Sequence, residues 1–213
     1  LAQLQNLPLF IEKRKKNFNT EYKAMPKSAK EKSKENFAIK FTYNSQKIEG
    51  STLTLKETAN LLENGISPNS KPLRDAKEAE SHRKVFFEML DHDKNMNLQI
   101  VLKWHKDLMQ STYEDIAGKI RNHNVAIAQS KFKPPMHLEL DTLLKEFFDW
   151  YNKEKKNTHP VELAALVHLK FVTIHPFTDG NGRISRLMMN FALKDNNFPL
   201  LDIQYINLSN RPG

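Results

Sequence analysis

Apolar side chains recur at intervals of three and four residues along most of this chain, which is the spacing of helices with one buried face. Residues 28–50 predict a long helix that ends at Gly50. Its inner side is defined by Phe37, Phe41, Asn44 and Ile48. A second helix should follow at once, because Thr54 and Glu57 form a capping box and Gly65 can close the helix.

Further helical patterns cover residues 73–91, 98–110, 139–153 and 160–174. A last helix should begin near Asn181, a good N-cap residue, with an apolar face made by Ile184, Leu187, Met188, Phe191 and Leu193. Strand signal is confined to residues 118–135, which alternate and contain Asn and Gly turn residues. The sequence therefore predicts an all-α domain with one small β-hairpin or extended flap.

Composition is ordinary for a globular protein: 213 residues, 39% hydrophobic and 27% charged, enough for one domain. The chain has no cysteine, which excludes disulfides and thiolate metal sites and suits a reducing compartment. The opening residues have an apolar stretch before the basic ones, the reverse of a secretory signal, and no segment is long enough to span a membrane. We expect a cytoplasmic protein without a membrane partner.

The net charge of +8 is concentrated near the N-terminus. Residues 11–40 hold ten Lys and Arg against four Glu, a net charge of +6. Such an arm can bind nucleic acid through phosphate contacts, but it has few aromatic residues for base stacking and no DNA-binding motif. A solvated helix face is therefore the favoured interpretation, and a nucleic-acid site the less favoured one.

The stretch "VTIHPFTDGNGRISRL" (172–187) contains an electrostatic contradiction. Gly180, Asn181 and Gly182 predict a tight loop, so Arg183 and Arg186 fall in the first turn of the helix that follows. Unpaired amides already make a helix N-terminus positive, and cations there are disfavoured. A bound polyphosphate resolves the contradiction, since turn amides, helix dipole and two guanidinium groups all favour it.

Two further residues of this stretch fit the same ligand. Asp179 would repel phosphate unless it binds Mg²⁺, which typically uses one or two carboxylates together with substrate phosphate oxygens. His175 precedes Pro176, where the preceding helix must stop, and can take a proton from an incoming hydroxyl. The alternative is that His175 only ends a helix and that the arginines pair with buried acids.

Other ligand motifs do not match. A Walker A loop is absent, and an EF-hand loop starting at Asp179 would place Arg183 and Ile184 where Asp or Asn and Gly are needed. The remaining histidines form no HExxH pair and no cluster with cysteine, which argues against zinc.

"HPFTDGNGRISR" resembles the motif HPFx[D/E]GNGRxxR of the Fic/Doc family and matches each of its fixed positions. "AGKIRNHNVAI" is similar to the target-docking flap of the family, and "IEGSTLT" to the segment after its inhibitory helix, so the resemblance covers about residues 36–207. It implies a Fic-type helical domain that transfers AMP from ATP to a hydroxyl of a target protein and releases pyrophosphate.

The resemblance also implies roles for single residues. His175 would deprotonate the target Ser, Thr or Tyr, Phe177 would anchor the loop, and Asp179 would hold Mg²⁺ between the α- and β-phosphates. Asn181 and the amides of Gly180 and Gly182 would cradle these phosphates. Arg183 would contact the β-phosphate and Arg186 the γ-phosphate. Glycine at 182 favours nucleotidyl transfer, because lysine there would indicate the Doc-like kinase branch.

An extended segment near residues 120–127 can pair with a target loop through backbone hydrogen bonds, with Ile120 or Val125 clamping the target side chain. The predicted docking residues are Lys119, Ile120, Arg121, Val125 and Ile127. A hairpin that only covers the core is the alternative. The expected partner is a protein with a hydroxyl side chain, while self-modification and homo-oligomer formation are left open.

Ser45 and Glu49 are four residues apart on one face of the N-terminal helix. "SQKIEG" resembles the inhibitory motif [S/T]xxxE[G/N] of the family, in which Glu49 would pair with Arg186 and displace the γ-phosphate. Residues 1–50 would then be a basic arm with an inhibitory helix, and residues 51–213 the catalytic domain, packed as one unit. The chain starts without Met and stops where relatives usually continue, so we expect a fragment.

Alternative functions are other phosphate-group transfer of the Fic type, removal of AMP, and a DNA-associated regulator that senses nucleotide.

Overall fold

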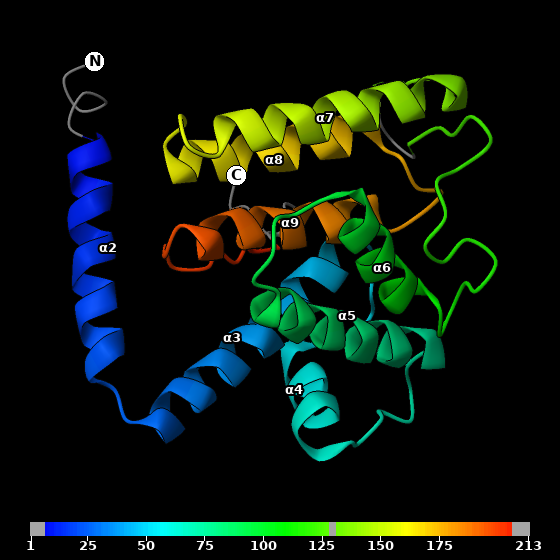
Figure 1. Cartoon of the computed structure of the whole chain (residues 1–213). Helices are drawn as coiled ribbons and strands as arrows, with labels where there is room; N and C mark the ends of the chain where they lie inside the picture. Colours follow the sequence, from blue (N-terminus) through cyan, green and yellow to red (C-terminus); the bar gives the residue numbers. More distant parts are fainter. Residues whose placement is uncertain (1–6, 128–130, 206–213) are drawn as a thin grey trace, which may run out of the picture.

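The computed structural model describes residues 7–127 and 131–205 (Figure 1). The helices are α2 (Leu7–Ala24), α3 (Lys27–Ile48), α4 (Leu55–Asn64), α5 (Leu73–Asp91), α6 (Leu98–Met109), α7 (Leu140–Glu154), α8 (Pro160–Ile174) and α9 (Asn181–Asp195), with a short 3₁₀ helix (His137–Glu139) before α7. No strand occurs in these two ranges. The all-α prediction is confirmed.

Local signals in the sequence place several helix ends. The capping box of α4 is present, with the Glu57 amide bonded to the Thr54 hydroxyl and the Thr54 amide bonded to the Glu57 carboxylate. Gly65 ends this helix in the left-handed conformation at φ 68°. Ile48 departs from its predicted place, because 40% of it is exposed near the end of α3.

Helix α9 lies at the centre of the domain. Each of its residues from Arg183 to Leu193 is buried. Other elements must therefore pack around the whole circumference of this helix. It packs most extensively on α8 and also contacts α3, α5 and α6 (Figure 1). Trp104, Phe171 and Phe191 fill the core around it. The N-terminal end of α9, where the predicted site lies, is thereby held by several elements at once.

The predicted β-hairpin is wrong for the described parts of the flap, 118–127 and 131–135, which consist of turn, bend and irregular residues and form no ladder. The backbone groups bond elsewhere. The Arg121 amide donates to the carbonyl oxygen of Pro176 at 2.9 Å, and the guanidinium donates to those of His123 and Pro135. One buried side chain therefore ties the two limbs together in place of strand pairing. Residues 128–130 of this prediction lie outside the described ranges.

Within the described part of the chain, none of the helices has the length and apolar character that crossing a membrane requires.

Candidate nucleotide and hydroxyl-acceptor site at the start of α9

His175 occupies an unusual backbone position between α8 and α9. It is the C-cap of α8 in the left-handed conformation, at φ 51° and ψ 57°, which costs a residue with a side chain roughly 1–2 kcal/mol. Pro176 follows, which disfavours the α-helical conformation at His175. Two hydrogen bonds hold it: its amide donates to the Phe171 carbonyl, and its carbonyl accepts from Nε of Arg121 at 2.9 Å.

The imidazole of His175 is set up as a neutral base. Its Nδ1 lies 3.2 Å from the carbonyl oxygen of Val172, and since a carbonyl only accepts, Nδ1 carries the proton. The lone pair of the neutral ring is then on Nε2. Burial lowers the pKa of His175; the Val172 bond opposes this shift, and the charge of Arg121 adds to it.

Asn181 does not act as the N-cap. Gly180 holds that position in the left-handed conformation at φ 82°, and Asn181 is the first residue of α9. The buried Asn181 side chain turns back on the loop, accepting from the Phe177 amide at 2.9 Å and donating to the Phe177 carbonyl at 2.8 Å. Its side chain therefore fixes the shape of the loop, which leaves only its backbone amide for the predicted phosphate contact.

His105 of α6 also holds the loop. Its ring stacks on Phe177 with centroids 3.7 Å apart, and its Nε2 lies 3.0 Å from the carbonyl oxygen of Asp179. Its Nδ1 accepts from the amide of Gly118, at the base of the flap. Burial lowers the pKa of His105 to about 4, so the neutral form that makes both bonds persists at neutral pH.

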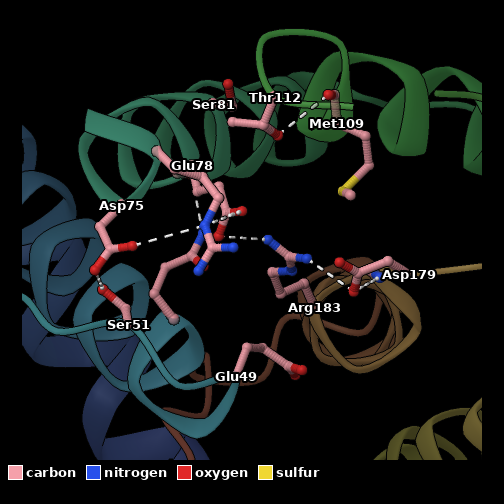
Figure 2. A network of polar contacts seen from close by, with 12 residues as sticks. Glu49, Ser51, Asp75, Glu78, Ser81, Met109, Thr112, Asp179 and Arg183 are labelled. Atoms are coloured by element: carbon pink, nitrogen blue, oxygen red, sulfur yellow. Dashed lines mark hydrogen bonds and ion pairs between the residues drawn. The ribbon is translucent and has the colours of Figure 1, made fainter. Parts of the chain in front are cut away.

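Arg183 bridges two carboxylates that come from different parts of the chain. Nη1 lies 3.1 Å from Glu78 of α5 and Nη2 lies 3.1 Å from Oδ1 of Asp179, while the residue is 1% exposed (Figure 2). Burial raises the pKa of Glu78, against the opposing charges of Arg183 and Arg74. The alternative of arginines paired with buried acids is thus realised at Arg183.

Asp179 keeps one carboxylate oxygen available for a cation. Its Oδ1 accepts from Arg183 and from the Gly180 amide, its Oδ2 has no partner in the described part of the chain, and its side chain is 46% exposed. Among the residues that the structure describes, no group of three His, Asp or Glu is placed to hold a metal ion without further ligands. The donor set fits a Mg²⁺ ion held jointly by Asp179 and substrate phosphates.

Arg186 contacts Ser45 and Glu49 at the C-terminal end of α3. It is 5% exposed, and its Nη2 lies 2.6 Å from Oε1 of Glu49. Nε donates to the Ser45 hydroxyl at 2.9 Å and Nη2 to the Ser45 carbonyl at 3.0 Å. The structure therefore brings together Ser45, Glu49 and Arg186 as the sequence predicted, across 141 and 137 positions of chain.

Gly182 has a steric role in this contact. A Cβ atom there would collide with Oε1 of Glu49 and lie 3.1 Å from Nη1 of Arg186. The Glu49 carboxylate thus sits directly over the first turn of α9, which is the position predicted for phosphate oxygens.

The predicted flap residues divide into two groups. Arg121 is buried and Ile120 packs against the core, so both belong to the support of the flap. Lys119 is exposed, and Val125 and Ile127 are half-buried. Sequence analysis missed the positioning roles of Glu78 and His105. The only signal was at His105, a polar residue on an otherwise apolar helix face, because the buried face around Glu78 also carries Asp75 and His82.

The site therefore combines a neutral histidine, a helix N-terminus and two arginines within one helical domain. Residues 95–193 match the model of the Fic/DOC family, so this part of the chain is a Fic/DOC domain. The chain is 32% identical over 168 residues to "Protein adenylyltransferase Fic" of Nematostella vectensis, covering 76% of this chain and 39% of the relative. It is 33% identical over 166 residues to "Protein adenylyltransferase fic-1" of Caenorhabditis elegans, covering 75% and 32%.

Solved structures show the same fold. A Fic domain containing signaling protein from Bacteroides thetaiotaomicron superposes with a TM-score of 0.81 at 28% identity, over 90% of this chain and 76% of the other. Fic-1 from C. elegans (residues 134–508) gives a TM-score of 0.79 at 25% identity, over 95% and 61%. The chain spans about a third to two fifths of the length of the two curated relatives.

Proposed function

We propose that this chain is a protein adenylyltransferase, which transfers AMP from ATP to a hydroxyl group of a protein and is repressed by its own Glu49. The names of the curated relatives support the reaction. The observation that carries the proposal is the start of α9, where two buried arginines and a helix N-terminus lie next to the loop of a neutral histidine.

In this reaction the oxygen of the target hydroxyl attacks the α-phosphorus of ATP. A new P–O bond forms to the target, the bond from the α-phosphorus to the oxygen bridging to the β-phosphate breaks, and pyrophosphate leaves. Nε2 of His175 accepts the proton of the hydroxyl, because Nδ1 already carries a proton toward Val172. The lowered pKa of His175 keeps this lone pair free at neutral pH.

The anionic triphosphate would be bound by the positive groups at the start of α9. Arg183 and Arg186 supply guanidinium groups, and the first turn of α9 supplies amides without partners in the helix. Mg²⁺ would be held by the free oxygen of Asp179 and by the phosphates, and it would supply charge neutralisation there. Glu78 keeps Arg183 fixed in the direction of Asp179.

The target would lie on the flap. Its backbone, which forms no ladder, can offer hydrogen bonds to a target loop, and exposed Lys119 with half-buried Val125 and Ile127 can contact target side chains. Arg121 joins this segment to the carbonyl of His175, so the docking surface and the base share one anchor. A Ser, Thr or Tyr hydroxyl held there would be positioned relative to His175.

Repression follows from the occupancy of Arg186. Glu49 and Ser45 satisfy three of its hydrogen-bonding positions, so a γ-phosphate must displace the Glu49 carboxylate to reach it. The position of that carboxylate over Gly182 adds steric and electrostatic opposition to phosphate.

The test is label transfer from ATP radiolabelled at either the α- or the γ-phosphate, with the Glu49→Ala variant and Mg²⁺. Retention of the α-label alone on protein is expected. Retention of the γ-label would assign the chain to phosphoryl transfer instead, and no label on self or on a panel of target proteins would refute the proposed activity.

A further inference from the structure

A hollow of about 700 Å³ lies at the opposite end of α9 from His175, and we call it the α2 groove. It opens between α2, α3 and residues 194–200, which follow from the last turn of α9. Since α9 has 15 residues, the α2 groove is about 20 Å from the start of that helix. Figure 1 shows α2 beside the body of the domain, joined to α3 at one end. The α2 groove is therefore separate from the site described above.

The floor of the α2 groove is largely apolar. Phe18 and Tyr22 of α2 stack with ring centroids 5.7 Å apart, and Phe18 remains 42% exposed. The facing wall is made by side chains of α3, of α5 and of the segment that follows α9: Phe37, Leu90, Phe198, Pro199 and Leu200. An open apolar hollow of this size is in the range that holds a ligand or the anchoring side chains of a peptide.

The rim of the α2 groove is cationic. Lys15, Lys23, Lys34 and Lys194 line it, and none of its 14 lining residues is Asp or Glu. Lys15 has Glu12 at 3.9 Å, and Lys194 has Asp93 at 3.5 Å. In the described ranges, no carboxylate pairs with Lys23 or Lys34. Half of the rim charge is thus uncompensated around an uncovered apolar floor.

Helix α2 is attached to the domain in a way that leaves this floor open. Nδ2 of Asn19 donates to the carbonyl of Asn197 at 3.1 Å, and Nζ of Lys15 lies 4.0 Å from the ring centre of Phe198. Ile11 packs against the main core. These contacts fix α2 as one wall, and within residues 7–127 and 131–205 no element covers the Phe18 face in the α2 groove.

We propose that the α2 groove binds an acidic peptide segment of a partner protein, with an apolar side chain on the floor and carboxylates at the lysine rim. An amphipathic segment in a groove between helices uses both features. The four lysines surround the floor, so they match several charges spread along a polymer better than one acidic head group. Phosphate contacts of nucleic acid would use the lysines but gain nothing from the apolar floor.

The proposal is tested with a fluorescein-labelled synthetic helical peptide that carries leucines at i, i+3, i+4 and i+7 and glutamates between them. Anisotropy titration with the full chain should show saturable binding. A peptide with the same leucines and lysines in place of the glutamates should bind at least about tenfold more weakly. Lys23→Glu with Lys34→Glu should lower the affinity for the acidic peptide about tenfold, and Phe18→Ser about fivefold.

The matched control is Lys13→Glu with Lys32→Glu, which makes the same charge change on the same two helices outside the α2 groove. It should change the affinity less than twofold, with unchanged far-UV circular dichroism in all variants. An equal loss in the control pair, no effect of Phe18→Ser, or no binding of the acidic peptide would overturn the proposal. Duplex DNA that binds more tightly than the peptide, with a loss in the Lys23/Lys34 pair and none in Phe18→Ser, would assign the rim to nucleic acid.

Discussion

Replacing Glu49 by Ala should release the proposed enzyme from repression. The change removes the carboxylate that lies 2.6 Å from Arg186 and leaves the two Ser45 contacts of that arginine in place. The γ-phosphate of ATP can then reach a guanidinium group that is still held in position. We expect faster modification, with the larger effect at low ATP, because the carboxylate competes with phosphate for one site.

The size of the effect follows from the burial of the pair. Arg186 is 5% exposed, whereas the side chain of Glu49 keeps 29% of its accessibility. A fully exposed pair contributes about 0.2–1 kcal/mol, and a charged hydrogen bond about 1.5–3 kcal/mol. An intermediate value of about 2 kcal/mol corresponds to roughly a thirtyfold rise in apparent ATP affinity. Glu49→Asp, one methylene shorter, should give a smaller rise.

The assay is initial-rate modification over an ATP titration, and the chain supplies its own matched control. Glu35 lies on the same helix and pairs with Arg83 at the same distance of 2.6 Å, away from α9. Glu35→Ala should leave the rate within twofold. Adding Arg186→Ala to Glu49→Ala should return activity to a low level, since ATP needs that arginine. If Glu49→Ala behaves like Glu35→Ala in a folded protein, the inhibitory role is refuted.

His175→Ala should reduce transfer at least about a hundredfold while ATP affinity, measured by calorimetry, stays within about twofold; equal losses of both would show a structural role. Asp179→Ala should lower activity in a way that excess Mg²⁺ does not restore, and a Mg²⁺ titration that recovers the full rate would contradict the metal assignment. Arg121→Met removes a charge that lowers the pKa of His175, so that pKa should rise. Because the base must be neutral, the acid limb of the pH–rate profile should move to higher pH; an unmoved limb with a lower rate would mean that Arg121 only supports the flap.

Helix positions were predictable because they depend on local signals. The ranges predicted for α5 and α8 agree with the structure, and the Thr54 capping box and Gly65 fix α4 from neighbouring residues alone. The flap prediction failed at strand pairing. Alternation indicates an extended segment, but whether its backbone bonds to a strand or to a buried arginine depends on tertiary packing.

The candidate site was predictable where its residues are contiguous or carry a spacing. Residues 175–186 lie within one loop and the first two turns of α9, and Ser45 and Glu49 share a helix face. Glu78 of α5 contacts Arg183 and His105 of α6 contacts the Asp179 carbonyl, and nothing in their local sequence indicates these partners. At Asn181 a local preference gave a wrong prediction. Asn favours the N-cap position, but the Asn181 side chain makes two hydrogen bonds to Phe177 instead.

Intact-protein mass spectrometry of the Glu49→Ala variant after incubation with Mg·ATP and a panel of candidate target proteins tests the central claim most directly. The account predicts that the modified protein, this chain or a target, gains the mass of one AMP, that the unmutated chain gains it far more slowly, and that adding His175→Ala abolishes the gain. A gain of one phosphate, or no gain in a folded variant that binds ATP, would contradict it.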